Sequence, residues 1–112
     1  RIVGYAYASK HNERGAYRYS ANVSVYIEEA FQGKGIGRAL YTELFNLMRE
    51  RGLYTAYAGI TVPNEKSVAL HAAFGFVPVG TFHKAGFKHG EWHDVMWMEK
   101  ALRDYGTPEG EI

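Results

Sequence analysis

A glycine-rich segment carries the clearest chemical signal in the sequence. Residues 32–38 read QGKGIGR and stand between a stretch of strand composition and an apolar pattern of helical period. Glycines let a backbone approach a ligand closely, and the N–H groups of a first helical turn favour an anion, reinforced by the helix dipole. Two basic residues add charge, so a pyrophosphate fits here, and a turn without a ligand is the alternative. The predicted anion-binding residues are Gly33, Lys34, Gly35, Ile36, Gly37 and Arg38.

Two common phosphate-binding loops match this segment poorly. A Walker A loop needs Gly-Lys-Ser/Thr, whereas Gly37 is followed by Arg38 and Ala39. The dinucleotide fingerprint needs the spacing GxGxxG and an acidic residue at the end of the next strand. Here the spacing is GxGxG, and the next apolar stretch ends at Val62. The segment therefore belongs to neither class.

The elements around the segment alternate between strand and helix patterns. From Ala39 the apolar residues Leu40, Leu44, Leu47 and Met48 fall at i, i+4, i+7 and i+8, one face of a helix that Gly52 would end. Asn64 is a good N-cap for a short second helix. The predicted order is strand 2–9, strand 17–27, helix from 39, strand 53–62, helix 65–74, strand 76–83, a turn or irregular loop over 84–90, and strand 92–100.

The composition is that of one globular domain. Of 112 residues, 46% are apolar and 22% charged, so residues 1–102 are expected to form a single domain followed by a loose polar tail over 103–112. The net charge of +1 disfavours nucleic acid as a partner, and the absence of cysteine excludes disulfides, thiolate zinc sites and a cysteine nucleophile. No apolar run approaches the ~18–20 residues of a membrane span, and no signal-peptide pattern follows Arg1, so a cytoplasmic protein is expected.

Several separated motifs, over about residues 2–100, resemble the GNAT acyltransferase superfamily. The glycine-rich segment matches its Gln/Arg-x-x-Gly-x-Gly/Ala loop. The narrower phosphinothricin N-acetyltransferase family is similar at GITVPN (59–64), SVALH (67–71) and GFKHGEWHDV (86–95), where Phe87 replaces a tyrosine. The resemblance implies an α/β (α+β) acyl-CoA N-acyltransferase fold, with a mixed, mostly antiparallel, splayed sheet flanked by helices. It also implies that a strand, two helices and a further strand before Arg1, which supply part of the acceptor site, are missing.

The same resemblance implies acetyl-CoA as co-substrate. In the family, the backbone of the strand segment matching Val25, Tyr26 and Ile27 hydrogen-bonds the pantetheine arm, and the loop matching residues 33–38 holds the pyrophosphate. The asparagine matching Asn64 also touches the cofactor, although a plain helix N-cap explains this residue equally well.

The resemblance assigns one catalytic residue and leaves another unassigned. His71 stands where the family has the group that protonates the departing thiolate, and an imidazole that titrates near neutrality can donate that proton. A helix histidine packed beside Phe74 is the alternative. The family's catalytic glutamate falls on Asn22, which cannot take a proton from an ammonium group. Glu28, Glu29 or a water relay is left as the source of the base.

The last motif supplies candidates for the acceptor pocket, although a tight turn or a polar strand edge explains them nearly as well. No metal is expected, because His89 is four residues from His93 but two nearby glycines disfavour the helix that would put both on one face, and no third ligand is evident. The predicted acceptor-site residues are Lys88, Trp92 and His93.

The expected function is transfer of acetyl from acetyl-CoA to the amine of a small amino-acid-like acceptor, of the phosphinothricin or methionine sulfoximine type. The amine attacks directly, without a covalent enzyme intermediate. Two alternatives stay open: a GNAT transferase for another amine or a peptide N-terminus, and an acetyl-CoA-binding module without turnover. The expected partner is a small molecule, neither nucleic acid nor membrane, and a homodimer is compatible with the sequence.

Overall fold

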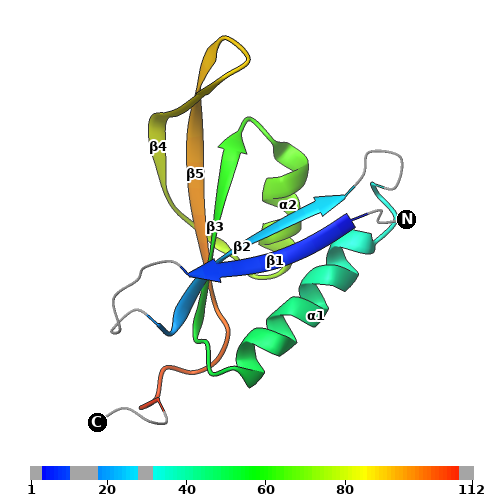
Figure 1. Ribbon diagram of the computed structural model, residues 1–112, viewed down its shortest axis with the longest axis vertical. Helices are drawn as coiled ribbons and strands as arrows, with labels where there is room; N and C mark the ends of the chain where they lie inside the picture. The colour runs from blue at the N-terminus through cyan, green and yellow to red at the C-terminus, as the bar shows by residue number, and fades with distance from the viewer. Residues whose placement is uncertain (1–3, 11–17, 28–31, 109–112) are drawn as a thin grey trace.

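Five strands and two helices make up the part of the chain that the computed structural model describes, residues 4–10, 18–27 and 32–108. The strands form one sheet in the order β1-β2-β3-β5-β4 (Figure 1). Only β2 and β3 pair in parallel among these neighbours, so the predicted mixed, mostly antiparallel sheet is confirmed. The elements are β1 (Gly4–Lys10), β2 (Ser20–Ile27), α1 (Ile36–Glu50), β3 (Thr55–Val62), α2 (Glu65–Ala73), β4 (Val77–Lys88) and β5 (Glu91–Ala101).

The core lies between one face of the sheet and helix α1, which packs on β1 and β2. The buried stripe of α1 consists of Tyr41, Phe45 and Met48. The predicted stripe, which contains Leu44 and Leu47, is displaced by about one residue, because Leu47 is 47% exposed. Two aromatic side chains bury more apolar area than the leucines they displace, so they set the rotation of the helix.

The sheet splays between its two parallel strands. The register of β2 with β3 runs only from Ser20–Thr55 to Asn22–Tyr57. Beyond that pair, β2 continues over 23–27 beside β1, and β3 continues over 58–62 beside β5. Figure 1 shows the two strands diverging toward their C-terminal ends. The facing edges of the two strands therefore open a gap at the centre of the sheet.

The predicted loop over 84–90 is wrong. Strand β4 continues to Lys88, and the hairpin turn consists of His89 and Gly90, whose φ angles of 53° and 76° match the twist of a tight two-residue turn. The irregularity that the glycines suggested lies inside β4, where residues 83–85 oppose Asp94 alone. A strand with such a bulge still pairs on both sides of it, which a composition pattern does not reveal.

The C-terminal segment has no regular structure over residues 102–108, but it is held against the domain. The Tyr105 hydroxyl lies 2.8 Å from Thr55 Oγ1, and its ring stacks on Tyr54 at 6.1 Å between centroids. Leu102 is buried in the core. No helix in residues 4–10, 18–27 and 32–108 is long and apolar enough to cross a membrane.

Candidate functional site

The N-terminus of α1 is built to leave its amide groups open. The helix begins at Ile36, three residues before the predicted start at Ala39, and Gly35 is its N-cap. Gly33 and Gly35 have φ angles of 79° and 78°, in the left-handed region that glycine adopts without a steric penalty. The first helical hydrogen bond runs from Ala39 N to Gly35 O at 3.1 Å, so the N–H groups of residues 36–38 have no carbonyl within the helix.

The same helix end is electrostatically suited to an anion. Its N-cap makes no side-chain hydrogen bond, and its first turn contains no acidic residue. Arg38 lies in that turn, and Lys34 lies in the preceding loop. The positive end of the helix dipole and these two cations therefore all favour a bound anion.

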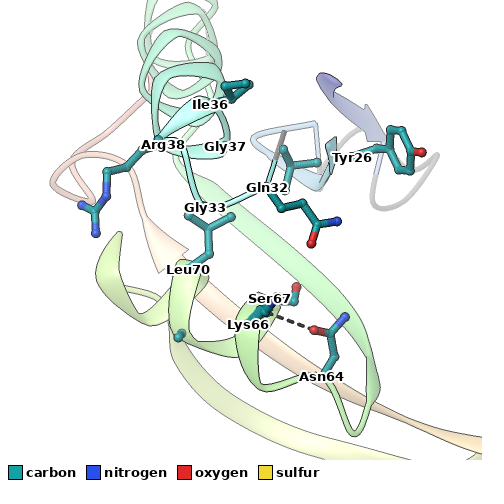
Figure 2. A pocket seen from close by; sticks show the side chains of 13 residues that line it. Tyr26, Gln32, Gly33, Ile36, Gly37, Arg38, Asn64, Lys66, Ser67 and Leu70 are labelled. Atoms are coloured by element: carbon teal, nitrogen blue, oxygen red, sulfur yellow. Dashed lines mark hydrogen bonds between the residues drawn. The ribbon is translucent and has the colours of Figure 1, made fainter. Parts of the chain in front are cut away.

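A cavity of about 850 Å³ opens in front of this helix end (Figure 2). The loop before α1 and its first turn form one wall, α2 forms the opposite wall, and the C-terminal part of β2 contributes a third. The volume is within the range of about 300–1,000 Å³ typical of small-molecule sites. The predicted residues that line it are Val25, Tyr26, Gly33, Gly35, Ile36, Gly37, Arg38 and Asn64. Lys34 and Ile27 are adjacent in sequence to this lining.

The wall formed by α2 adds polar groups to the rim. Asn64 caps the helix, since its side-chain Oδ1 accepts a hydrogen bond from Ser67 N at 3.1 Å. The predicted cap is confirmed, and its contact with a cofactor stays a prediction. Lys66 also lines the cavity, whereas no aspartate or glutamate does so among the described residues. The rim therefore complements a ligand with several negative charges.

His71 lies on α2 behind this wall and is 3% exposed. Its Nδ1 is 2.7 Å from the carbonyl oxygen of Ser67, and its Nε2 is 2.8 Å from the hydroxyl of Tyr41 on α1. Burial lowers the pKa of His71 below its ordinary value, more than the bond to Ser67 raises it. Donation of a proton to a thiolate would require the ring to leave one of these partners, so the catalytic role of His71 stays a prediction.

The predicted acceptor residues lie on the β4–β5 hairpin, apart from the residues that line the cavity. Trp92 is 62% exposed and packs edge-on against Phe87, with ring centroids 5.1 Å apart. His93 donates from Nε2 to the carbonyl oxygen of Lys88 at 3.1 Å. These contacts stabilise the end of the hairpin, and contact of Lys88, Trp92 and His93 with an acceptor stays a prediction.

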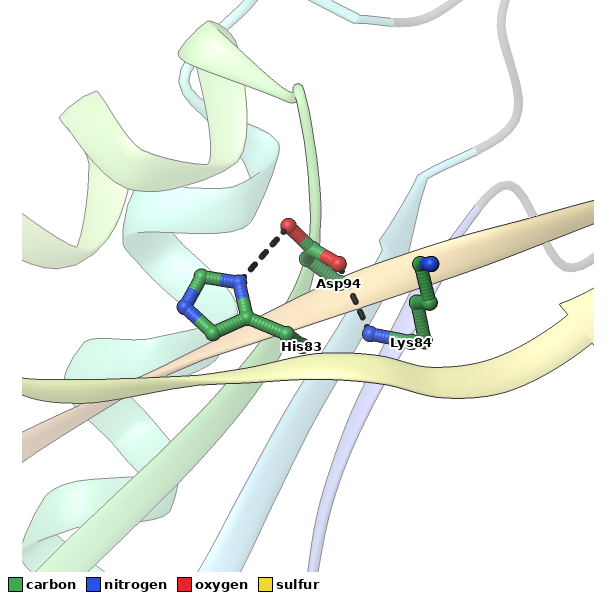
Figure 3. A network of polar contacts seen from close by, with 3 residues as sticks. All are labelled: His83, Lys84 and Asp94. Atoms are coloured by element: carbon green, nitrogen blue, oxygen red, sulfur yellow. Dashed lines mark hydrogen bonds and ion pairs between the residues drawn. The ribbon is translucent and has the colours of Figure 1, made fainter.

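Asp94 fixes the bulge in β4 (Figure 3). Its Oδ1 accepts from the backbone N–H of Lys84 at 2.8 Å, and its Oδ2 is 3.2 Å from His83 Nδ1. The bond from Lys84, followed by that from His83, lowers the pKa of Asp94. Lys84 has a φ of 53°, so Asp94 holds a backbone conformation that side-chain-bearing residues rarely adopt.

Asn22, at the position of the absent glutamate, is the last residue of β2 that pairs with β3. It is therefore at the point where the sheet splays, opposite Tyr57. Burial and, secondarily, Glu99 raise the pKa of Tyr57, so its hydroxyl is protonated at neutral pH. Glu28 and Glu29, the other sources named for a base, lie outside the described residues.

Sequence reasoning missed Tyr41 and the four residues of α2 that line the cavity, Lys66, Ser67, Ala69 and Leu70. Lys66 and Leu70 follow Asn64 by two and six residues and are four residues apart, so they lie on one face of the helix that Asn64 caps. Helical spacing could therefore have predicted that both line the cavity. Tyr41 had no such signal, because its partner is 30 residues away in the sequence.

The chain matches the acetyltransferase (GNAT) domain over residues 1–97. Phosphinothricin N-acetyltransferase from Streptomyces coelicolor is 45% identical to it over 101 residues, which cover 90% of this chain and 59% of that protein. L-methionine sulfoximine/L-methionine sulfone acetyltransferase from Salmonella typhimurium is 33% identical over 108 residues, which cover 96% of this chain and 63% of that protein.

Solved structures give the same result. A GNAT superfamily phosphinothricin acetyltransferase from Sinorhizobium meliloti, crystallised in complex with acetyl-CoA, superposes with a TM-score of 0.89 at 40% identity. The match covers 96% of this chain and 60% of that one. The chain therefore spans about three fifths of the length of the relatives it matches.

Proposed function

Because the chain belongs to the GNAT acetyltransferase family, we propose that it binds acetyl-CoA in the cavity before α1 and transfers the acetyl group to the amine of a small amino-acid-like acceptor. Acetyl-CoA supplies an acetyl group activated as a thioester. The observation that carries the proposal is the N-terminus of α1, which faces that cavity and has neither a side-chain hydrogen bond from its N-cap nor an acidic residue in its first turn. The relatives are named for phosphinothricin and methionine sulfoximine, which are acceptors of this class.

The residues of the cavity fit the cofactor in three places. The N–H groups of residues 36–38, with Lys34 and Arg38, would hold the pyrophosphate. The edge of β2 at Val25, Tyr26 and Ile27 is not paired with β3, so its backbone groups suit the amides of the pantetheine arm. Asn64 and Lys66 would close the rim on the side of α2.

The point where β2 and β3 diverge bears on how the acceptor amine loses its proton. An ammonium group must lose a proton before it can attack a thioester, and Asn22 at the point of divergence cannot accept that proton. We propose that water carries this proton to the solvent. We also propose that the acceptor is contacted from the hairpin by Lys88, Trp92 and His93. The protein is further proposed to be cytoplasmic and to form a homodimer.

Replacing Asn22 with glutamate tests this assignment. The native rate of acetyl-CoA-dependent thiol release should climb with pH toward the pKa of the acceptor amine. The Asn22→Glu variant should level off at lower pH and exceed the native rate by roughly tenfold near pH 6.5, because a carboxylate of pKa ~4–6 acts as the base. The matched control is Asn22→Gln, whose side chain has the length of glutamate but ends in an amide that accepts no proton, and which should leave the profile unchanged.

Two outcomes would contradict parts of the proposal. A native rate that levels off near pH 6–7 would mean that another residue supplies the base. The chain could also bind CoA normally but release no thiol with any acceptor offered, whether amino acids, phosphinothricin or methionine sulfoximine. It would then be a binding module that does not turn over acetyl-CoA.

A further inference from the structure

We propose that Tyr41 and His71 are positioning residues, which hold the two helical walls of the cavity at the spacing that CoA requires. This inference rests on the proposed function, because it concerns the same cavity. It gives His71 a role through Tyr41 and α1 in place of direct contact with the thiolate.

The hydrogen bonds define the state of the pair. The Ser67 carbonyl oxygen can only accept, so His71 Nδ1 carries the hydrogen that it donates over 2.7 Å. In a neutral imidazole the Nε2 atom is then an acceptor, and the Tyr41 hydroxyl donates to it over 2.8 Å. Both nitrogens of His71 are thus engaged, one within α2 and one with α1.

Burial keeps both partners neutral. Tyr41 is fully buried and His71 is 3% exposed. Burial raises the pKa of the tyrosine hydroxyl and lowers the pKa of the imidazole, so neither group ionises near neutral pH. The bond between the helices is therefore directional and uncharged, and its loss would leave a buried polar atom without its partner.

The pair lies one helical turn behind the cavity on each side. Tyr41 follows Arg38 by three residues on α1, and His71 follows Ser67 by four on α2, and both Arg38 and Ser67 line the cavity. The ring of Phe45 supports Tyr41 from below at 4.9 Å between centroids. The bond therefore connects the wall that bears the anion-binding amides with the wall that bears Asn64.

Loss of the hydrogen bond between Tyr41 and His71 should weaken CoA binding by changing the conformations of the protein before CoA binds. Without it, the two walls sample several spacings, and only a fraction of molecules is ready to bind. The apparent Kd rises by the inverse of that fraction. A role for His71 as the acid alone predicts a different pattern, with slower thiol release and unchanged CoA affinity.

Tyr41→Phe removes one hydroxyl and nothing else. Isothermal titration with CoA, at a temperature where near-ultraviolet circular dichroism shows the variant to be folded, should give a Kd about tenfold above native. The matched control is Tyr54→Phe, which removes the hydroxyl of another buried tyrosine that does not line the cavity. Its Kd should be native.

Two substitutions of His71 complete the test. In His71→Gln the amide oxygen can still accept from Tyr41, whereas the shorter side chain of His71→Asn can reach only the Ser67 carbonyl. We expect native CoA affinity for glutamine and about a tenfold loss for asparagine. Native affinity in Tyr41→Phe, or equal affinity in the two His71 variants, would overturn the positioning role. Failure of the native chain to bind CoA would instead overturn the proposed function.

Discussion

Replacing Gly35 with valine is expected to lower the affinity for CoA by roughly ten- to a hundredfold, which is about 1–3 kcal/mol of binding free energy. Gly35 caps α1 with a φ of 78°, which a β-branched residue adopts only with strain. A Cβ at this position meets no protein atom within 4 Å, so it would stand in the space that the pyrophosphate must approach. Isothermal titration of the folded variant with CoA measures the effect.

Gly52→Val is the matched control for this experiment. Gly52 follows the other end of α1 with a φ of 82°, and a Cβ there also meets nothing within 4 Å. Both variants therefore carry similar backbone strain, but only Gly35 borders the cavity. Equal loss of CoA affinity in the two variants would attribute the effect to helix stability, and unchanged affinity in Gly35→Val would place the site elsewhere.

Replacing Phe45 with alanine is expected to lower the free energy of unfolding by about 3–5 kcal/mol. Phe45 is 2% exposed, and its ring centroid lies 4.9 Å from that of Tyr41 and 5.4 Å from that of Phe74. The substitution removes one of the rings through which α1 packs against the end of α2 and leaves a cavity among these neighbours. Because domains are stable by about 5–15 kcal/mol, this is a large share of the total. Equilibrium unfolding in urea measures it.

Leu47→Ala on the same helix is the control for Phe45→Ala. Leu47 is 47% exposed, so its truncation should cost no more than about 1 kcal/mol. If both variants lost the same stability, α1 would not present Tyr41, Phe45 and Met48 to the sheet. The rotation of α1 that the predicted leucine stripe implies would then be correct after all.

Local signals were sufficient for most elements. Gly52 and Gly75 end the two helices with φ angles of 82° and 89°, and Asn64 begins the second with its side-chain cap. These boundaries depend on the conformational preferences of single residues, which the sequence displays directly. The full length of the β4–β5 hairpin was not predicted, because residues 84–88 have the composition of a loop. They nevertheless belong to β4, which pairs with β5 on both sides of a bulge that Asp94 stabilises from the opposite strand.

The candidate site likewise has a part that the local sequence predicts and a part that depends on long-range packing. The glycine pattern of residues 33–38 predicts an open helix N-terminus, since that property is local. The depth of the cavity depends on how α2 packs against α1, and so on Tyr41 and His71, which are 30 residues apart. The place of Lys88, Trp92 and His93 depends on where the hairpin extends relative to β3, which no local pattern encodes.

The most direct test of the account is a titration of the ¹⁵N-labelled chain with CoA, followed by amide chemical shifts. The account predicts that the largest shifts fall on the amides of residues 33–38, where the pyrophosphate would bind, and next on those of 64–67 at the opposite wall. The amides of the β4–β5 turn should move least, because His89 and Gly90 do not line the cavity. Saturating CoA that leaves residues 33–38 unshifted, or that shifts the hairpin most, would contradict the central claim.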